Sequence, residues 1–419
     1  MTDRNANRPG YKKTKVGWIP EEWECVPLGE VYDVQLGKML SSLARVGKDP
    51  QPYLANFNVR WASFDHSFIQ KMDFSETERK KFELRLGDLL VCEGGEPGRC
   101  AIWTEQIRPC YFQKALHRLR AKDGRILNAF AQAFLFRMTE DPIILNLTSR
   151  TSIAHLTREK LLALPLPLPP LPEQKKIVEI LSAWDEAIEH ARRLVAAAKR
   201  RKKGLMQQLL TGKRRLPGFG GKWPVKKMSQ VSRRITESPK STKGYAVLSI
   251  TAGTGFVSQE EKFSRVIAGR HIENYILLKR GEFAYNKGNS YRFPQGCAYR
   301  LSEYDEGLVP DVFFSFRVIS EVADEGFVEQ FFRSGLHGEQ LRQWVNTGVR
   351  NNGLLNLNAA DFFNLKIPSP ALAEQRAIAA VLSAADEEIK ALETECAALE
   401  HQKKGLMQKL LTGEARVIK

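Results

Sequence analysis

The chain contains two near copies of one 41-residue segment, and this repeat limits how the chain can fold. Residues 173–213 and 374–414 align without a gap at an offset of 201 positions, and 21 of the 41 positions are identical, including the strings KKGLMQ and LLTG. Weaker similarity extends outward, because a proline-rich stretch precedes each copy and Trp23 and Trp223 stand at an offset of 200. A period of about 200 residues is far longer than that of a solenoid repeat. The sequence therefore predicts two copies of one module, each with a variable block and a repeated segment.

Apolar residues at alternating spacings of four and three predict that each repeated segment is a helix with a coiled-coil seam. The predicted seam comprises Ile177, Leu181, Trp184, Ile188, Val195, Leu205 and Leu209 in the first copy, and Ile378, Leu382, Ile389, Leu392, Leu399, Leu406 and Leu410 in the second. Proline precedes each helix and Gly212 and Gly413 follow it, as is typical of helix starts and ends. Gly204 and Gly405 interrupt both helices at equivalent positions and indicate a bend or a close crossing.

The charges of the two helices differ. Ten Lys or Arg and no acidic residue lie between Arg192 and Arg215, whereas the matching part of the second copy carries Glu. Opposite charge favours pairing of the two helices with each other, although such charges also suit solvated faces. Because each helix follows a globular block, the pair is predicted to be antiparallel.

The fold class predicted is α+β, with two mixed α/β domains separated by a long antiparallel two-helix coiled coil and a pseudo-twofold internal repeat. Strand-like runs occupy 88–94, 100–103, 115–120, 245–250, 282–286 and 312–319, and helical patterns occupy 128–138 and 328–345. The predicted divisions are a flexible segment 1–14, a first domain 15–166, a helical spacer 167–216, a second domain 217–367, a helical spacer 368–413 and a tail 414–419.

A net charge of +16 favours a polyanionic partner, of which nucleic acid is the commonest. Both blocks contain glycine-rich loops with Arg, Lys, Asn, Ser and Tyr, the side chains that hold phosphate or read base edges in the major groove. The candidate DNA-binding residues are Lys38, Arg45, Arg99, Lys114, Arg150, Thr151, Ser152, Lys243, Lys287, Asn289, Ser290, Tyr291, Arg292, Arg350, Asn351 and Asn352. The alternative for each of them is an ordinary surface loop.

The motifs of the common catalytic sites are missing. The six cysteines form no CxxC pair, which argues against a structural metal site, and their scatter indicates reduced thiols in a cytoplasm. The sequence has no phosphate-binding GxxxxGK[ST], no GxSxG and no HExxH, and it has no signal peptide and no membrane-spanning run. Two alternatives to a DNA-binding module remain open, namely a stand-alone nuclease or methyltransferase and a coiled-coil scaffold that does not bind DNA.

The chain resembles the specificity subunits of type I restriction–modification systems. The resemblance rests on PxPxxPEQxxI…LSxxDxxI…KKGLMQxLLTG at 167–212, repeated at 368–413 with Ala373 in place of Pro172, and on GWIPEEW…PLGEV at 17–31. It implies a non-catalytic subunit in which the two domains are target-recognition domains. Each domain reads one half of a bipartite asymmetric site in double-stranded DNA, and the conserved helices set the spacer between the halves.

The resemblance also implies partners. Two copies of a methyltransferase subunit would carry S-adenosylmethionine, and a restriction or translocase subunit would use ATP and Mg2+, while this chain would hold no cofactor and no metal. Docking of the methyltransferase is expected around Glu173, Gln174, Asp185, Glu374, Gln375 and Asp386. Trp184 is replaced by Ala385 in the second copy, so the two docking surfaces are not strictly equivalent. The resemblance identifies neither the target sequence nor the residues that read bases.

Overall fold

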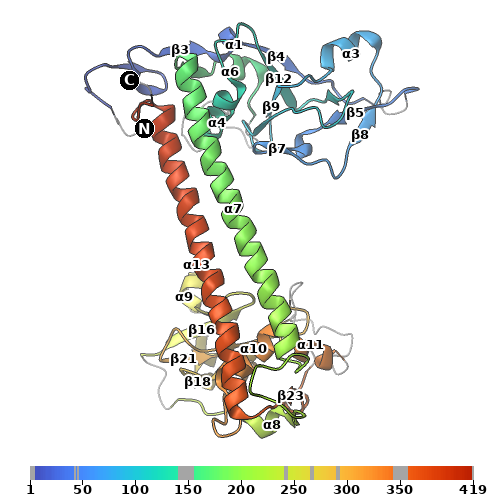
Figure 1. The fold of residues 1–419 in the computed structure, drawn as a ribbon, viewed down its shortest axis with the longest axis vertical. Coiled ribbons are helices and arrows are strands. Elements are labelled where there is room, and N and C mark those ends of the chain that lie inside the picture. Colours follow the sequence, from blue (N-terminus) through green and yellow to red (C-terminus); the bar gives the residue numbers. More distant parts are fainter. Residues whose placement is uncertain are drawn as a thin grey trace. The chain divides into compact units, whose positions relative to one another are not determined.

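The computed structural model describes residues 5–41, 44, 47–139, 155–239, 244–264, 269–288, 293–342 and 357–417. The chain divides into two compact units. Unit 1 comprises Met1–His190 and Glu395–Lys419, and unit 2 comprises Ala191–Thr394. Both boundaries fall inside long helices, α7 (Leu171–Leu209) and α13 (Leu372–Leu411), so each unit contains part of both helices (Figure 1).

Unit 1 is built on a four-stranded antiparallel sheet with the strand order β10-β9-β12-β4. Its strands are β1 (Tyr11–Thr14), β2 (Gly17–Pro20), β3 (Glu24–Pro27), β4 (Tyr32–Leu36), β5 (Gln51–Leu54), β6 (Val59–Arg60), β7 (Ser63–Phe64), β8 (Gln70–Met72), β9 (Leu89–Cys92), β10 (Cys100–Ile102), β11 (Tyr111–Phe112), β12 (Leu116–Ala121) and β13 (Pro165–Leu168). Its helices, besides its parts of α7 and α13, are α1 (Leu28–Val31), the 3-10 turn η1 (Asn56–Asn58), α3 (Glu76–Phe82), α4 (Asn128–Met138) and α6 (Arg158–Leu162). A second sheet has the order β11-β5-β8, and β1-β2, β3-β13 and β6-β7 form two-stranded pairs.

The central sheet of unit 1 separates two hydrophobic cores. Strand β9 is buried along its whole length, and because successive side chains point to opposite faces, Leu89 and Val91 enter one core while Leu90 and Cys92 enter the other. The first core includes α4 and the two long helices, and the second includes α3 and the β11-β5-β8 sheet. A strand buried on both faces reads as a continuous apolar run, which is why the sequence predicts this strand well.

Unit 2 repeats this scaffold, because its sheet β20-β19-β22-β15 has the same strand order as β10-β9-β12-β4. Its strands are β14 (Val225–Lys227), β15 (Ser232–Arg234), β16 (Ala246–Thr251), β17 (Gly255–Ser258), β18 (Ile276–Lys279), β19 (Phe283–Asn286), β20 (Cys297–Arg300), β21 (Glu306–Val309), β22 (Phe314–Val318) and β23 (Lys366–Pro368). Its helices, besides its parts of α7 and α13, are α8 (Met228–Val231), α9 (Gln259–Phe263), the 3-10 turn η2 (Gly269–Asn274), α10 (Glu325–Ser334), α11 (Leu336–Leu341) and α12 (Ala359–Phe363).

The second sheet distinguishes the two units. In unit 2 it has four strands in the order β17-β16-β21-β18, whereas in unit 1 it has three. The pairs β3-β13 and β14-β23 are equivalent, and α4 packs on β10 as α10 packs on β20. The two units therefore share one scaffold and differ in what is added to it.

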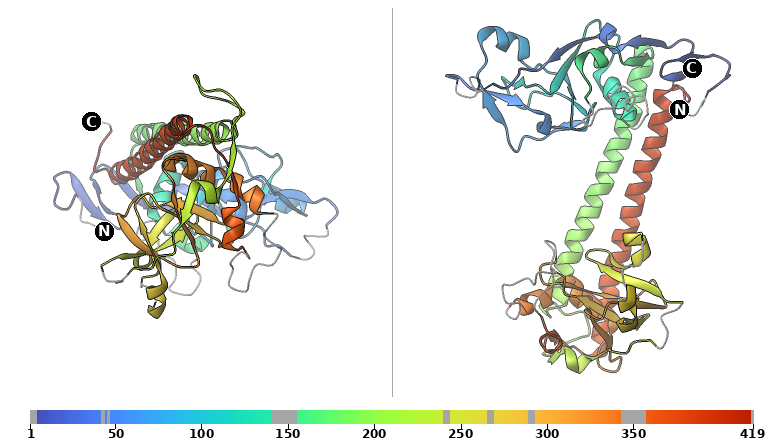
Figure 2. Two further views of the ribbon diagram at one scale, coloured as in Figure 1. Left: turned by 90° about the horizontal axis from the view of Figure 1, so that it is seen from below. Right: turned by 180° about the vertical axis from the view of Figure 1, so that it is seen from behind.

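The two long helices are antiparallel within each unit. In unit 1, Ile177 and Leu181 near the start of α7 share a core with Met407 and Leu410 near the end of α13. In unit 2, the end of α7 shares a core with the start of α13 through Met206, Leu209, Ile378 and Leu382. Figure 2 shows the paired segments running alongside each other from two further sides. These contacts confirm the predicted antiparallel pairing of the repeated segments.

Most predicted elements match the structure, with one correction. All six strand-like runs contain a strand, and α4 coincides with the predicted 128–138. The predicted helix at 328–345 is instead two helices, α10 and α11, because Gly335 adopts a positive φ of 79° between them. Glycine adopts this left-handed conformation at little cost, so it ends one helix and redirects the chain into the next.

The glycines of the long helices behave in two ways. Gly212 and Gly413 have φ of 69° and 68° just beyond the helix ends, as predicted. Gly204 and Gly405 lie inside continuous helix, and a Cβ built on either of them would meet no heavy atom within 4 Å. The expected close crossing at these two positions is therefore absent from the described part of the chain.

Candidate nucleic-acid interface and the helix-start clamps

Three loops of unit 1 converge at one place, which we name the loop cluster and define as residues 56–58, 93–99 and 155–156. Asn56 Nδ2 donates to Gly94 O at 3.0 Å, and Leu156 N donates to Glu93 O at 2.7 Å. Gly94 also has a close neighbour, because a Cβ built on it would lie 3.2 Å from the His155 ring. The sequence predicts 93–99 and 146–157 as separate DNA-facing loops, and the structure brings their described parts together.

Arg99 joins two of the loops in this cluster. Its guanidinium donates to Asn56 O at 3.0 Å and pairs with Glu96 at 3.0 Å, and its side chain is only 15% exposed. Buried His117 on β12 adds a further tie, since its Nε2 lies 3.0 Å from Leu156 O. Burial lowers the pKa of His117, so the ring is held in its neutral form. Arg99 therefore shapes the loops, and its charge is largely used within the chain.

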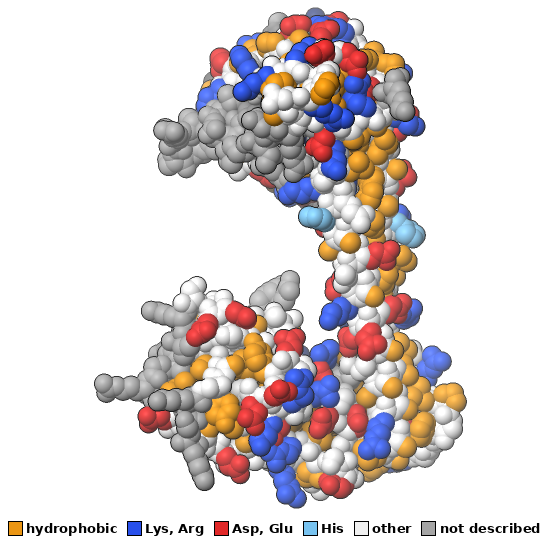
Figure 3. Space-filling model, turned by 90° about the vertical axis from the view of Figure 1, so that its left-hand side faces the viewer, with side chains coloured by type: hydrophobic (Ala, Val, Ile, Leu, Met, Phe, Trp, Pro, Cys, Tyr) orange, Lys and Arg blue, Asp and Glu red, His pale blue; other side chains and the backbone are white. Residues whose placement is uncertain are grey.

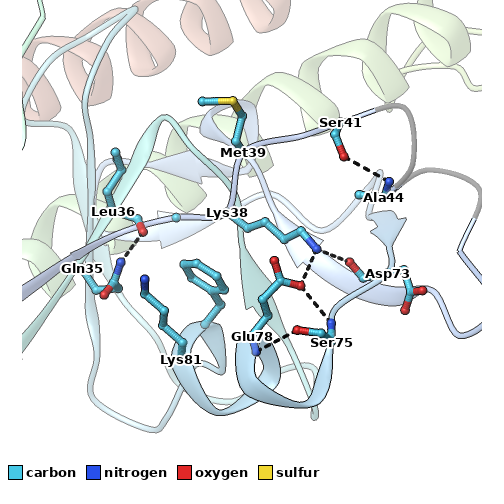
Figure 4. A pocket seen from close by; sticks show the side chains of 12 residues that line it. Gln35, Leu36, Lys38, Met39, Ser41, Ala44, Asp73, Ser75, Glu78 and Lys81 are labelled. Atoms are coloured by element: carbon cyan, nitrogen blue, oxygen red, sulfur yellow. Dashed lines mark hydrogen bonds and ion pairs between the residues drawn. The ribbon is translucent and has the colours of Figure 1, made fainter.

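Lys38, like Arg99, uses its charge within unit 1. It lines a pocket of about 670 Å³ (Figure 4). Its ammonium group donates to Asp73 O and pairs with the Glu78 carboxylate, each at 2.7 Å. Burial raises the pKa of Glu78, but the bonds from Lys38 and Ser75 outweigh this effect and the net shift is downward. Ser75 and Glu78 also form the capping box that starts α3. The Lys38–Glu78 ion pair therefore ties the segment that follows β4 to the start of α3.

The pocket wall carries few groups that remain free to bind. Lys81, Ser41 and Met39 line it and are exposed, and Met39 is 66% exposed. Figure 4 shows the Lys38 and Glu78 side chains pointing toward each other across this wall. The pocket thus combines one neutralised ion pair with a mixed polar and apolar rim.

The other candidate DNA-binding residues divide into two groups. Lys114 is exposed, and Lys287 lies with its ammonium 5.2 Å from the centroid of the Phe314 ring. The following candidates lie outside the described residues: Arg45, Arg150, Thr151, Ser152, Lys243, Asn289, Ser290, Tyr291, Arg292, Arg350, Asn351 and Asn352. On the face drawn in Figure 3, Lys and Arg are interspersed with Asp and Glu, so the positive excess is not gathered into one patch there.

The Glu-Gln pair that starts α7 holds together three parts of unit 1. The Glu173 carboxylate is 2% exposed and accepts hydrogen bonds from Trp23 Nε1 at 2.9 Å and from Arg416 Nε at 2.7 Å. Gln174 accepts from Leu127 N at 2.9 Å and donates to Arg125 O at 2.8 Å. We name this arrangement the helix-start clamp of unit 1. It joins the first strands, the start of α7 and the segment that follows α13.

Unit 2 contains the same clamp made from the matching residues. The Glu374 carboxylate is 1% exposed and accepts from Trp223 Nε1 at 3.0 Å and from Arg215 Nε at 2.6 Å. Gln375 accepts from Asp324 N at 2.9 Å and donates to Val322 O at 3.3 Å. The hydrogen bond to Glu374 raises the pKa of Arg215, as expected for a cation stabilised by a carboxylate.

The clamps use four of the residues around which docking of a partner is expected. Glu173, Gln174, Glu374 and Gln375 are buried and use their polar atoms within their own units, and docking around them stays a prediction. Sequence reasoning missed the arginines of the clamps. Arg215 and Arg416 stand at the repeat offset of 201 just beyond the aligned segments, and that spacing was the available signal.

The two aspartates of the expected docking surface form ion pairs between the long helices. Asp185 pairs with Lys403 in unit 1, and Asp386 pairs with Lys202 in unit 2. Asp386 also accepts from Gln330 Nε2 at 3.0 Å. These pairs join the LSxxD part of one repeat to the KKGLMQ part of the other, so both strings have a structural use.

The predicted seam lies on the inner faces of the helices. Buried seam residues are Ile177, Leu181, Ile188, Leu209, Ile378, Leu382 and Leu410, and half-buried ones are Trp184, Val195, Leu205, Ile389, Leu392, Leu399 and Leu406. In unit 2 the ion pairs Lys199–Glu393 and Arg201–Glu388 flank the seam. The predicted attraction between the basic part of α7 and the acidic part of α13 is thus present.

Neither a metal centre nor a bilayer-crossing helix is found in the described ranges. Among these residues no three His, Cys, Asp or Glu side chains gather in a way that could hold a metal ion. None of the helices they form has an apolar stretch of the length that crossing a bilayer requires.

Comparison with known proteins finds matches of one kind. Residues 20–197 match the type I restriction modification DNA specificity domain. The MjaX type I restriction enzyme specificity subunit of Methanocaldococcus jannaschii is 26% identical, with 97% of each chain covered. The MjaVIII specificity subunit of the same organism is 24% identical over 95% of this chain and 94% of its own length.

Solved structures show the same fold. The S subunit of a type I restriction–modification system from M. genitalium superposes with a TM-score of 0.53 at 16% identity, covering 93% of this chain and 96% of that one. A chain from a study of complex assembly and conformational transition of the type I R-M system gives 0.56 at 17% identity, covering 95% and 99%. The chain is thus similar over nearly its whole length to type I restriction–modification specificity subunits, and its duplicated scaffold and paired helices agree with the fold of the solved S subunit.

Proposed function

We propose that this non-catalytic DNA specificity subunit reads a split, asymmetric site in double-stranded DNA, one half with each unit. The observation that carries the proposal is the duplicated scaffold, in which β10-β9-β12-β4 and β20-β19-β22-β15 share one strand order while the second sheets differ. A shared scaffold gives both units the same way of approaching DNA. Different added strands and loops give each unit its own base contacts, and base contacts specify sequence.

The long helices would set the spacer between the two half-sites. α7 and α13 both continue without a break across the boundaries between the units. Sequence readers that approach one side of DNA face it again after one turn, about 34–36 Å. The length of the connecting helices would therefore fix how many base pairs separate the half-sites.

Two copies of one methyltransferase subunit would dock on the repeated helices. Identical exposed residues occur at equivalent positions of both helices, although the fold gives them no evident use: Ser182 and Ser383, Ala183 and Ala384, Glu186 and Glu387. Gly204 and Gly405 add a second signal, because a glycine inside a helix costs about 1 kcal/mol relative to alanine and neither has a close neighbour. A partner that binds twice through the same residues explains why both copies keep them.

The remaining chemistry would belong to the partners. The methyltransferase copies would supply S-adenosylmethionine, and a restriction or translocase subunit would supply ATP hydrolysis with Mg2+. The complex would act in the cytoplasm on cellular and invading DNA, where the six cysteines, all free, would remain reduced. This chain would recognise the DNA sequence and bind the partner subunits.

Methylome sequencing tests the proposal directly. A host that carries the system with and without this gene should differ by one split adenine-methylated motif, with two unlike halves and a fixed spacer. Replacing only residues 217–367 by the equivalent domain of a related subunit should change one half of the motif and leave the other intact. An unchanged methylome on deletion of the gene, or a change of both halves on the exchange, would count against it.

A further inference from the structure

Two phenylalanine side chains lie exposed and next to each other on unit 1. Phe57 is 42% exposed and Phe68 is 61% exposed, and their ring centroids are 6.1 Å apart with the ring planes tilted by 31°. Burying a phenylalanine side chain ordinarily stabilises a fold. A single exposed apolar residue is ordinary, but a contacting pair of aromatic rings on the surface of one domain indicates a contact surface.

The pair is held in place by one buried amide. Asn58 is only 1% exposed, and its Oδ1 accepts a hydrogen bond from Ala55 N at 2.9 Å. Its Nδ2 donates to Asp65 O and to Phe68 O, each at 2.9 Å. The amide thus ties the backbone of the turn that carries Phe57 to the backbone of the residue that carries the other ring. Buried amides are retained when all their hydrogen bonds are made, so the two rings are preorganised.

Phe57 belongs to the loop cluster, and Phe68 lies against it. Asn56, the neighbour of Phe57, donates to Gly94 O, and Arg99 donates to Asn56 O. The nearby charges are paired, since Arg60 binds Asp65 at 3.0 Å and Arg99 binds Glu96. The rings are therefore an uncharged, apolar element at the edge of the loops predicted to face DNA.

We propose that Phe57 and Phe68 contact the 5-methyl groups of thymine in the half-site that unit 1 reads. The inference rests on the proposed function and deepens it. A phenyl ring offers neither a donor nor a charge to a phosphate, so a ring that meets DNA contacts the bases, by apolar contact or by stacking. The base faces of an intact duplex are already stacked on one another, which leaves apolar contact with the base edges. The thymine methyl group is the one apolar feature that the major groove displays, and phenylalanine is among the side chains that contact it.

The experiment uses the assembled complex of this chain with its methyltransferase and a duplex that contains the methylated motif. Fluorescence anisotropy at fixed salt gives Kd for the wild type and for the variants Phe57→Ala, Phe68→Ala and the double variant. We expect the double variant to lose about tenfold or more in affinity for the specific duplex. Affinity for a duplex without the motif should stay unchanged, and so should the salt dependence, because no phosphate contact is removed.

Replacing single thymines of the unit 1 half-site by uracil isolates the methyl group. With the wild type, at least one replacement should weaken binding about three- to tenfold, because one buried methyl group is worth about 0.8 kcal/mol or somewhat more. With the double variant, the same replacement should have no effect. Leu86→Ala is the matched control, since Leu86 is an exposed apolar residue of the same unit, at 68%, and should bind like the wild type.

Several results would overturn the inference. Two concern affinity: an unchanged Kd in the double variant, or an equal loss of affinity for the specific and the non-specific duplex. The others are a half-site without thymine on either strand, or loss of methyltransferase from a complex that otherwise still reads its site. Thermal unfolding of each variant separates loss of contact from loss of fold, and the more exposed Phe68→Ala serves if the double variant is unstable. If the wild-type complex itself reads no split site, the proposed function fails instead, so the two failures remain distinguishable.

Discussion

At the scale of single residues, the most demanding feature is the pair of buried carboxylates in the helix-start clamps. Glu173 and Glu374 are almost inaccessible to water, and each is compensated by one arginine and one tryptophan. A buried charge is costly unless it is paired and hydrogen-bonded. The clamp is therefore stable only when segments distant in sequence are all in place.

Removing the arginine of a clamp should strongly destabilise its unit, and a second substitution at the buried glutamate should restore much of the lost stability. We expect Arg416→Met to lower the free energy of unfolding of unit 1 by about 3 kcal/mol, because Glu173 would remain buried without its cation. Adding Glu173→Gln should restore much of the loss, since the neutral amide needs no counter-charge. Denaturant unfolding of the single and double variants measures this, and equal loss in both variants would contradict it.

Buried His337 should make unit 2 sensitive to acid. Burial lowers its pKa to about 4, against about 6.5 for an exposed histidine. Between pH 4 and 6.5 the histidine is protonated in the unfolded chain but neutral in the folded one. The free energy of unfolding of unit 2 therefore has its full value above pH 6.5. It falls by about 3 kcal/mol as the pH drops toward 4.

The comparison of His337 with a residue that does not titrate isolates this effect. His337→Gln should flatten the change in unfolding free energy between pH 6.5 and 4, whatever its effect at pH 7. Aromatic neighbours Tyr285, Phe331 and Phe332 surround the ring and do not titrate in this range. An identical pH profile in wild type and variant would show that the imidazole is not responsible.

At the scale of elements, the long helices combine residues explained by the fold with residues that it leaves unused. The seam, the aspartate–lysine pairs and the clamps account for nine of the 21 identities between the two copies. The helix-interior glycines are different, because each weakens its own helix and a Cβ built on either would meet no described heavy atom within 4 Å.

Replacing these glycines should therefore separate stability from assembly. Gly204→Ala and Gly405→Ala should each raise helix stability by up to about 1 kcal/mol and weaken the docking of one methyltransferase copy. Native mass spectrometry would show loss of one copy in each single variant and of both in the double variant. Arg200→Ala is the control, since it is exposed and its counterpart is His401. Full occupancy in the double variant would remove the argument that these glycines serve docking.

The elements also show what the sequence could predict. The long helices and the strands of the central sheets were predictable because their apolar residues recur with a clear period or form continuous runs. The break at Gly335 was not, because the flanking residues 328–334 and 336–341 both suit a helix and only the backbone conformation separates them.

The candidate site was less predictable than the fold. Lys38 and Arg99 carry the chemistry expected for DNA contact, but their charges are paired within unit 1, and pairing depends on residues far away in sequence. The sequence does not show that Phe57 and Phe68 are exposed, because an apolar residue is ordinarily assigned to a core. Only the burial of Asn58 between them shows that they are held at the surface.

At the scale of the whole molecule, the helices connect the two units and their length is the adjustable quantity. Removing one heptad from each, Val195–Arg201 and Glu388–Thr394, keeps the seam in register and deletes the ion pairs Lys199–Glu393 and Arg201–Glu388 whole. Seven residues of helix are about 10.5 Å, or about three base pairs. We expect a methylated motif with the same two halves and a spacer about three base pairs shorter, and an unchanged spacer would refute the proposed role.

The division of the chain has a consequence for its synthesis. Unit 2 is one continuous stretch, whereas the core of unit 1 is completed by Met407, Leu410 and Leu411. At about 5–20 residues per second, the ribosome needs on the order of 10–40 s to add the roughly 200 residues that separate the two parts of unit 1. During that time the first 190 residues of the nascent chain carry an uncovered apolar face, so we expect unit 2 to complete its core before unit 1 does.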